Sequence, residues 1–296
     1  MYQNPYEILE NGSWIKTNFH THAGTGPNTC GSNSIDSVTE LYRRLGYGAL
    51  CISNHDLFTD TTARSDEEIF FIPGVEYSQD EHMLTIGVNQ SLHTLPHQEA
   101  INEANRQNGF VILCHPNWMR KEYWPWEKAE ALHGYAGIEI MNTLIYRLRG
   151  SGRATDTWDH LLQQGKLVFG FGNDDFHFPF DAGRCWTDIY AKEKNYASIK
   201  EAIDCGRFVA STGLCLADFK LVDNCMHVQV KHSKETYVQS FCYRFISEKG
   251  LVKETCGEFA QYQLQGEKYV RVEAIAENGA MLFTQPVYDT SFFKKT

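Results

Sequence analysis

The sequence lacks the long apolar run that a membrane-spanning helix needs. No stretch approaches the roughly 18 apolar residues that cross a bilayer. The first residues also lack the basic and apolar segments of a secretory leader. With 42% hydrophobic and 22% charged residues, the composition is that of a folded globular chain. We therefore expect a cytoplasmic protein with no membrane partner.

Paired cysteine motifs and common nucleotide-binding motifs are absent as well. The nine cysteines are scattered and include no C-x-x-C pair, which argues against a disulfide framework and against a zinc ribbon. We expect reduced thiols, with Cys30 as an exception considered below. The sequence has no Walker-type loop, no dinucleotide-binding glycine loop and no Gly-x-Ser-x-Gly elbow. P-loop, Rossmann-type and serine-hydrolase mechanisms are therefore not indicated.

Positive charge is scarce, since the formal net charge is −10. General nucleic-acid binding needs a basic patch that displaces counterions, so we expect no general nucleic-acid-binding surface. An anionic substrate is compatible with this charge only if the site itself is locally positive. Bound divalent cations would provide that local charge.

From residue 14 to about residue 213 the chain repeats one theme, in which a short apolar run ends in a polar cluster. The runs are residues 15–19, 47–53, 69–75, 110–114, 137–141 and 167–172. Continuous apolar runs are typical of buried parallel strands. Amphipathic segments over residues 34–45, 97–108, 156–164 and 198–205, each followed by glycine, predict helices. The alternation predicts an α/β fold, with the polar clusters at the carboxyl ends of barrel strands.

After about residue 214 the pattern changes to alternating strands. They are predicted at residues 226–231, 237–246, 260–264 and 269–275, with turn signals at 248–250 and 277–279. This pattern predicts a separate β-sandwich of about 80 residues. We therefore expect two domains, residues 1–213 and residues 214–296.

Histidines and carboxylates gather at the ends of the predicted strands. His20-x-His22 places two imidazoles on one side of a strand, because alternate strand residues point the same way. Asp175-x-His177 repeats this spacing after the last run. The other strand-end candidates are His55, Glu76, His82, His115 and Glu139. Such a mixture of imidazole and carboxylate ligands suits manganese, zinc or iron.

In this order and spacing, the residues resemble the polymerase-and-histidinol-phosphatase (PHP) superfamily. The short sequence motifs that flank them look like those of the branch of predicted phosphoesterases that includes the CehA/McbA-type metallohydrolases. These motifs are Trp14-x-Lys16-x-Asn18-x-His20-x-His22, Pro73-Gly74-Val75-Glu76 and the segments 137–142 and 206–213. The resemblance covers about residues 14–213, and its motifs are specific only as a set.

The resemblance implies a distorted (β/α)7 barrel of the PHP type with up to three divalent metal ions, followed here by the small all-β domain. The ligands that it implies for the first ion are His20, His22, Glu76 and Asp175. Those for the second are Glu76, as a bridge, with His82 and His115, and those for the third are His55 and His177.

One loop departs from the family pattern. The family usually has an aspartate or histidine shortly after His-x-His, whereas this chain has a longer loop, residues 23–31, that carries Cys30 in that place. Cys30 is either a thiolate ligand, which would favour zinc or iron, or a bystander that leaves the third site weak. We favour the bystander interpretation.

Together these features predict a metal-dependent phosphoesterase acting on a small phosphorylated substrate, including a nucleotide or short oligonucleotide. Water attack at the metal site would depend on the catalytic residues Glu76, Asp175 and His177, and Arg184 would clamp a phosphate oxygen. The Trp-rich segment 117–126 is expected to form one wall of the pocket. A carboxylic or carbamate ester hydrolase on the same site, and a non-catalytic metal-binding scaffold, stay open as alternatives.

Overall fold

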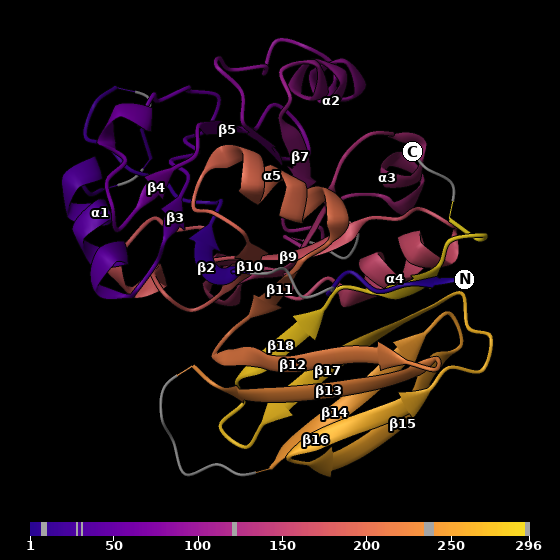
Figure 1. The fold of residues 1–296 in the computed structure, drawn as a ribbon. Helices are drawn as coiled ribbons and strands as arrows, with labels where there is room; N and C mark the ends of the chain where they lie inside the picture. Colours follow the sequence, from indigo (N-terminus) through magenta and orange to yellow (C-terminus); the bar gives the residue numbers. More distant parts are fainter. Residues whose placement is uncertain (7–10, 28, 31, 120–122, 234–239, 294–296) are drawn as a thin grey trace.

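The computed structural model describes residues 1–6, 11–27, 29–30, 32–119, 123–233 and 240–293. A mixed α/β part carries the five α-helices of these residues, and an all-β part lies beneath it (Figure 1). None of the helices described is long and apolar enough to cross a membrane. The cytoplasmic location stays a prediction.

Four helices lie close to their predicted segments. They are α1 (Ile35–Arg44), α2 (His97–Arg106), α4 (Thr155–Gln163) and α5 (Tyr196–Cys205). The side chains of Ser34 and Asn195 cap α1 and α5, and Gly206 ends α5 with a positive φ of 73° that glycine adopts without strain. A short fifth helix, α3 (Trp126–Ala131), follows Pro125 and was not predicted. Short 3-10 turns η1 (Thr62–Arg64), η2 (Leu144–Arg147) and η3 (Pro179–Asp181) lie in the loops.

One sheet of the mixed part has the order β5-β6-β7-β8-β9. Its strands are β5 (Gly74–Tyr77), β6 (Met83–Ile86), β7 (Phe110–Leu113), β8 (Gly137–Asn142) and β9 (Phe169–Asn173). Strands β7, β8 and β9 are parallel, but β6 is antiparallel to both of its neighbours. The prediction of parallel strands alone was therefore wrong here, because the connection 78–82 is too short for a parallel crossover.

The other strands of the mixed part belong to a second sheet. Its strands here are β2 (Ser13–Asn18), β3 (Ala49–Leu50), β4 (Phe70–Phe71), β10 (Trp186–Ala191) and β11 (Phe208–Ser211). Strands β2, β3 and β4 are parallel, while β10 is antiparallel to β2 and β11. Pro73 divides the predicted run 69–75 into β4 and β5, since proline offers no N–H to a ladder.

The two sheets meet through isolated parallel bridges, Thr21 with Phe176 and His55 with Glu76. The structure does not show the expected distorted (β/α)7 barrel. The described residues form a mixed α/β fold that is rich in strands, and several strand-to-strand connections contain no α-helix. Periodicity identified apolar runs but carried no information about which runs pair antiparallel.

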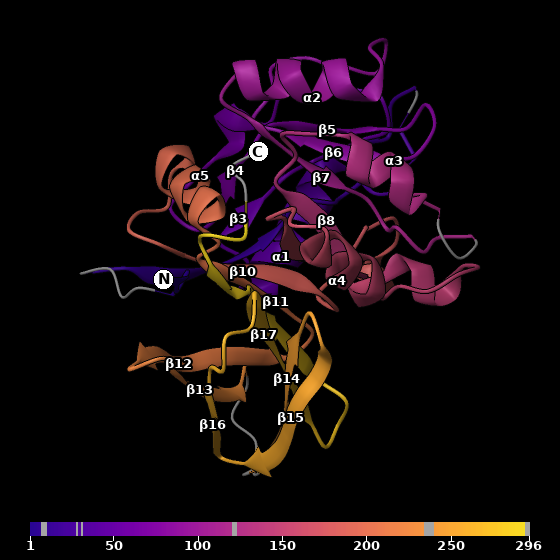
Figure 2. The ribbon, with the colours of Figure 1, turned by 90° about the vertical axis from the view of Figure 1, so that its right-hand side faces the viewer.

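The all-β part consists of two facing layers (Figure 2). One layer is β12 (Leu214–Val222), β13 (Cys225–His232) and β16 (Phe259–Gln263), and the other contains β14 (Phe241–Ser247), β15 (Gly250–Gly257) and β17 (Tyr269–Ala276). Alternate side chains such as Val228, Phe245 and Val272 fill the space between the layers. Of the predicted strand 237–246, residues 237–239 lie outside the described part of the chain.

Hydrogen bonds connect the two parts of the molecule. Strand β18 (Met281–Thr284) pairs with β17 on one side and with β11 of the mixed part on the other. Strand β19 (Val287–Asp289) pairs with β17 and with β1 (Tyr2–Gln3). One continuous sheet therefore contains strands from both sides of the predicted boundary at residue 213. The division into domains 1–213 and 214–296 stays a prediction.

A buried ion network also joins the two parts. Arg271 of β17 is almost completely buried and donates to both carboxylate oxygens of Asp159 in α4, at 2.7 and 2.6 Å. It also donates to Glu273 at 2.8 Å, and Glu273 accepts from Arg153 at 2.6 Å. An unpaired buried charge is strongly unfavourable, so the pairing of Arg271 and Glu273 with these partners contributes to holding the two parts together.

We predict that Arg271→Met lowers the free energy of unfolding by about 3–5 kcal/mol, because Asp159 loses its ion-pair partner and keeps only the hydroxyl of Tyr269, and Glu273 loses one of its two arginines. Urea denaturation in the presence of a chelator measures the change. Arg244→Met is the matched control, since Arg244 pairs with Glu254 on the surface and should cost at most about 1 kcal/mol. Equal effects of the two substitutions would show that the buried network does not stabilise the interface.

Candidate metal centre

The structure brings together all eight residues that the sequence predicted as metal ligands. They are His20, His22, His55, Glu76, His82, His115, Asp175 and His177. Most of them follow or end a strand of one of the two sheets. His82 instead precedes β6, and it reaches the cluster because β5 and β6 form an antiparallel hairpin.

Glu76 lies at the middle of this cluster and contacts five histidines. Its Oε2 atom is 3.1 Å from the Nε2 atoms of both His20 and His22, and 2.8 Å from His55 Nδ1. Its Oε1 atom is 2.9 Å from His82 Nδ1 and 3.4 Å from His115 Nε2. A carboxylate in this position can bridge two cations.

Several of these atoms are buried without a hydrogen bond, which is how a metal site is expected to look. Among the described residues, no hydrogen bond is made by His20 Nε2, His22 Nε2, His55 Nδ1, Glu76 Oε2 or Asp175 Oδ1. Buried polar atoms are rarely left unpaired, because each loses its water without compensation. Here the unpaired atoms face one another, so cations between them would satisfy the whole set. The residues present fit the divalent ions that the sequence predicted.

The candidate ligand atoms fall into compact groups, within each of which they lie no more than 4.8 Å apart. The groups are His20, His22 and Asp175; His55, Glu76 and His82; His20, Glu76, Cys114 and His115; and His22, Cys30, His55 and His177. The first corresponds to the predicted first site. His55 belongs to two groups, whereas the resemblance implied only the third site for it. Cys114 was not predicted, and burial raises its thiol pKa well above the ordinary value.

Two candidate ligands have an unusual backbone. Asp175 has a φ of 54° and His115 a φ of 30°, in the left-handed region that residues with a side chain rarely adopt. Both residues are buried, and the surrounding structure holds them in this conformation. Such local strain is typical of functional sites, where it directs a side chain that a regular strand would point elsewhere.

The carboxylates keep the cluster ionised. Burial alone would lower the pKa of His20, but Asp175, Glu76 and Glu139 outweigh it and raise the pKa well above its ordinary value. Burial would raise the pKa of Glu76, yet His20 and His55 hold it well below the usual range. The site therefore offers ionised carboxylates to a cation, which would displace protons from the imidazoles.

A second layer of polar residues orients the candidate ligands. Glu139 Oε1 accepts from His20 Nδ1 at 2.8 Å, which leaves the Nε2 lone pair of His20 facing Glu76 and Asp175. Glu139 Oε2 accepts from the backbone N–H of His115 and from Asn142, both at 2.8 Å. The sequence marked Glu139 as a strand-end residue without a role, and it missed Asn142, which ends its run in the same way.

Asp174 was also missed, although it anchors the loop that follows β9. Burial raises its pKa to about 6, and its carboxylate accepts hydrogen bonds from the backbone N–H groups of residues 183–185. The hydroxyl groups of Tyr42 and Tyr47 donate to it as well. These bonds tie the loop with His177 and Arg184 to the buried end of β9.

The predicted phosphate clamp is not part of the cluster. Arg184 is exposed, and within the described residues its guanidinium makes no hydrogen bond or ion pair. Arg147, by contrast, donates two bonds of 2.9 Å to Asp181. Asp181 also accepts from the backbone N–H of His177, so Arg147 is held close to a candidate ligand.

Aromatic rings lie against the histidines on another side. The ring of Trp118 is 5.3 Å from that of His82 and 5.0 Å from that of His115, and Tyr123 lies beside Trp118 at 5.1 Å. These two residues come from the segment 117–126 that was expected to form a pocket wall. Residues 120–122 of that segment lie outside the described part of the chain.

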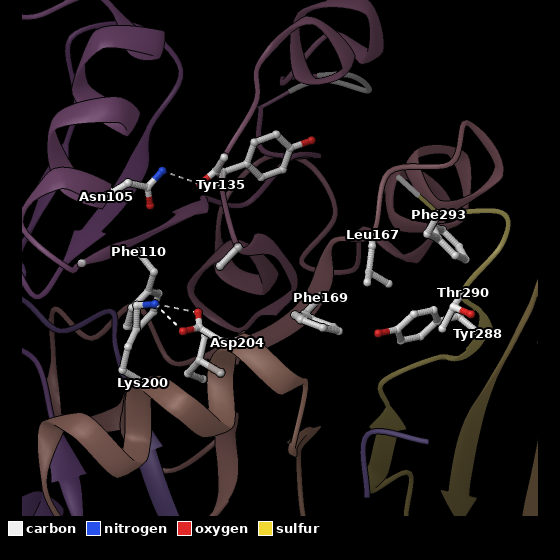
Figure 3. Close-up of a pocket in the computed structure, with 14 residues that line it drawn as sticks. Asn105, Phe110, Tyr135, Leu167, Phe169, Lys200, Asp204, Tyr288, Thr290 and Phe293 are labelled. Carbon is white, nitrogen blue, oxygen red and sulfur yellow. Dashed lines mark hydrogen bonds and ion pairs between the residues drawn. The ribbon is translucent and has the colours of Figure 1, made fainter. Parts of the chain in front are cut away.

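Figure 3 shows residues that line a cavity of about 500 Å³, and the candidate ligands are not among them. Its walls include Phe110 and Phe169, the first residues of β7 and β9, together with Tyr288 and the Lys200–Asp204 ion pair. The candidate ligands His115 and Asp175 follow the opposite ends of the same strands. This cavity is therefore separate from the candidate metal centre.

No protein-family model and no curated protein match the sequence. Among solved structures, the chain is similar to a two-domain protein from Bacteroides vulgatus that contains a predicted PHP-like metal-dependent phosphoesterase. That likeness has a TM-score of 0.53 at 17% identity, and it covers 94% of this chain and 95% of the other. The predicted resemblance to the PHP superfamily is confirmed at the level of the fold. Membership of the CehA/McbA branch stays a prediction.

Two further matches are weaker and cover part of the chain. The lesion-specific endonuclease PfuEndoQ from Pyrococcus furiosus matches with a TM-score of 0.44 at 14% identity, over 65% of this chain and 56% of its own. Endonuclease Q in complex with a 27-mer duplex that has an abasic lesion at the active site matches with a TM-score of 0.46 at 13% identity. This match covers 64% of this chain and 56% of the other.

The DNA in that complex corrects one expectation from the sequence. We expected no general nucleic-acid-binding surface, and this exclusion was wrong, because a protein matched by this chain binds a DNA duplex. The exclusion rested on the net charge of the whole molecule. Contact with a phosphate backbone depends on local charge, to which bound cations contribute.

We predict that Glu139→Gln weakens the binding of manganese or zinc about 10–100-fold, because the amide no longer supplies negative charge to His20. Isothermal titration of the chelator-treated protein measures this change. Glu103→Gln is the matched control, since Glu103 pairs with Arg106 on the surface of α2 and should leave affinity unchanged. Unaltered affinity in Glu139→Gln would remove the orienting role of this carboxylate.

Proposed function

We propose that the protein is a metal-dependent hydrolase that cleaves a phosphate ester at a site of two or three divalent ions. One observation carries the proposal: histidine and carboxylate side chains converge in a buried region, and five of their facing atoms have no hydrogen bond among the described residues, namely His20 Nε2, His22 Nε2, His55 Nδ1, Glu76 Oε2 and Asp175 Oδ1. Manganese, zinc and iron accept such a mixture of ligands. The fold shared with a protein that contains a predicted PHP-like phosphoesterase supports the same class of reaction.

We assign the ligands as the sequence resemblance implied, with one addition from the geometry. The first ion would be held by His20, His22, Asp175 and Glu76; the second by Glu76, His82 and His115, with His55 also within reach of it; and the third by His55 and His177.

When bound, the ions would supply a hydroxide nucleophile near neutral pH and positive charge for the substrate oxygens. The protein contributes position. The two oxygens of Glu76 face different histidines, so this carboxylate would be shared by the first two sites. The left-handed backbone of Asp175 turns its carboxylate toward His20 and His22. His177 is partly exposed, so we place the substrate entrance on its side.

Arg184 would act on the substrate and not on the ions. Its guanidinium is exposed and makes no ion pair among the described residues, while its backbone is held by Asp174. A guanidinium binds two phosphate oxygens at once, which suits a phosphate ester better than a neutral ester.

We predict that the manganese- or zinc-loaded protein hydrolyses bis(p-nitrophenyl) phosphate or p-nitrophenyl phosphate, and that a chelator abolishes this activity, because the nucleophile requires the ions. Release of p-nitrophenol measures the rate. Turnover of p-nitrophenyl acetate alone would instead support a carboxylic or carbamate ester hydrolase. Less than one equivalent of bound metal after loading would favour the non-catalytic scaffold.

We also predict that Glu76→Ala lowers metal-dependent turnover at least ~100-fold, because the carboxylate shared by two sites is lost. Circular dichroism should show the same fold. Glu103→Ala on the surface of α2 serves as the control and should retain full activity. Wild-type rates in a folded, metal-loaded Glu76→Ala variant would exclude the bridging role.

A further inference from the structure

Cys30 lies beside three histidines at the outer side of the candidate metal centre. Its Sγ atom is 3.1 Å from His22 Nδ1. The potential ligand atoms of His22, Cys30, His55 and His177 all lie within 4.8 Å of one another. Donor atoms at about 2.0–2.3 Å from one zinc ion are separated by at most about 4.6 Å, so the group has nearly the size of one coordination sphere.

The roles of His22 and His177 follow from which ring nitrogen carries the proton in each imidazole. His22 Nε2 faces Glu76 and Asp175 at 3.1 and 3.4 Å, so this nitrogen belongs to the first site. An imidazole that uses Nε2 as a ligand carries its proton on Nδ1. His22 Nδ1 therefore donates to Cys30 Sγ, and a sulfur that accepts such a bond is favoured as the thiolate.

In His177, the nitrogen that is left to bind a cation is Nε2. Its Nδ1 atom is 3.1 Å from the backbone carbonyl oxygen of Asp175, to which an N–H must donate. The proton on Nδ1 leaves the Nε2 lone pair for a cation, which is the usual arrangement for a metal-bound histidine. The Ser32 hydroxyl lies 3.5 Å from the His177 carbonyl oxygen and connects the Cys30 loop to this residue.

The other cysteine near the cluster behaves differently. Cys114 is completely buried in the hydrophobic core, and its Sγ contacts the carbonyl oxygen of Ile112 at 3.8 Å as a thiol donor would. Cys30 is exposed, and its sulfur lies among the imidazoles of His22, His55 and His177. The two sulfurs therefore differ. Cys114 also lies within 4.8 Å of candidate ligand atoms, but it is a fully buried thiol that donates to a backbone carbonyl, whereas Cys30 accepts from an imidazole.

We propose that Cys30 is a thiolate ligand that completes a third site with His55 and His177, and that this site selects a thiophilic ion such as zinc or iron(II) over manganese. The inference rests on the proposed metal centre and deepens it. It replaces the bystander interpretation that the sequence favoured. A thiolate in place of an oxygen ligand changes which ion the site prefers, since sulfur ligands select softer metals.

The test uses cobalt(II), which reports sulfur ligation by absorption without any need for turnover. Chelator-treated full-length protein is loaded with cobalt(II) chloride, and near-ultraviolet spectra are recorded. We expect a sulfur-to-cobalt charge-transfer band in the wild type and in the control Cys205→Ser, whose cysteine is exposed on α5. The band should be absent in Cys30→Ser and Cys30→Asp. A wild type saturated with three equivalents but without the band would overturn the proposal, as would an unchanged band in Cys30→Ser.

A second measurement needs no variant. Zinc chloride should protect Cys30 of the wild type from alkylation by iodoacetamide at least ~10-fold, while Cys205 reacts at the same rate with and without zinc. Mass spectrometry of the peptides gives both rates. Equal alkylation of Cys30 in the presence and absence of zinc would reject its ligation.

A third measurement compares the affinities of the third site for zinc and for manganese. Cys30→Asp should shift the competition between zinc and manganese at the third site toward manganese by ~10-fold or more. The outcomes also separate the two proposals. A cobalt–sulfur band without hydrolysis of any phosphate ester would leave Cys30 as a ligand and reject the phosphoesterase, whereas hydrolysis without the band would reject Cys30 alone.

Discussion

The carboxylate of Glu76 is the element on which the rest of the site depends. Five imidazoles approach its two oxygens, and they come from strands and loops that are far apart in the sequence. Without cations between them, these groups would bury unpaired nitrogens and oxygens at high cost. The second layer formed by Glu139, Asn142 and Asp174 fixes the orientation of the cluster, so binding energy is not lost in rearranging it.

The sequence predicted which residues cluster better than it predicted the fold that carries them. His20-x-His22 and Asp175-x-His177 were recognisable because alternate positions of an extended chain face one way. The same periodicity missed β6 and β10, and it could not indicate that β6 runs antiparallel. Pairing direction depends on connection length and tertiary contacts, which a local pattern does not contain.

Roles were harder to predict than positions. Glu139 stood at a strand end like the candidate ligands, and only its contact with His20 Nδ1 identifies it as an orienting residue. The same holds for Cys30, whose sulfur lies 3.1 Å from His22 Nδ1, a contact that depends on tertiary structure and not on a local sequence pattern. Asp174 was next to a predicted ligand, yet its burial and its tyrosine partners come from a helix and a loop elsewhere in the chain.

The pairing of β11 with β18 has a consequence for how the chain folds. One edge of β11 finds its partner only after some seventy further residues, and β1 pairs with a strand at the other end of the chain. Non-local pairings of this kind slow folding, because a long loop must close before any contact compensates for the lost entropy. During synthesis the mixed α/β part therefore exposes an open sheet edge at β11 until β18 has left the ribosome, and an unpaired edge of this kind favours association with other chains.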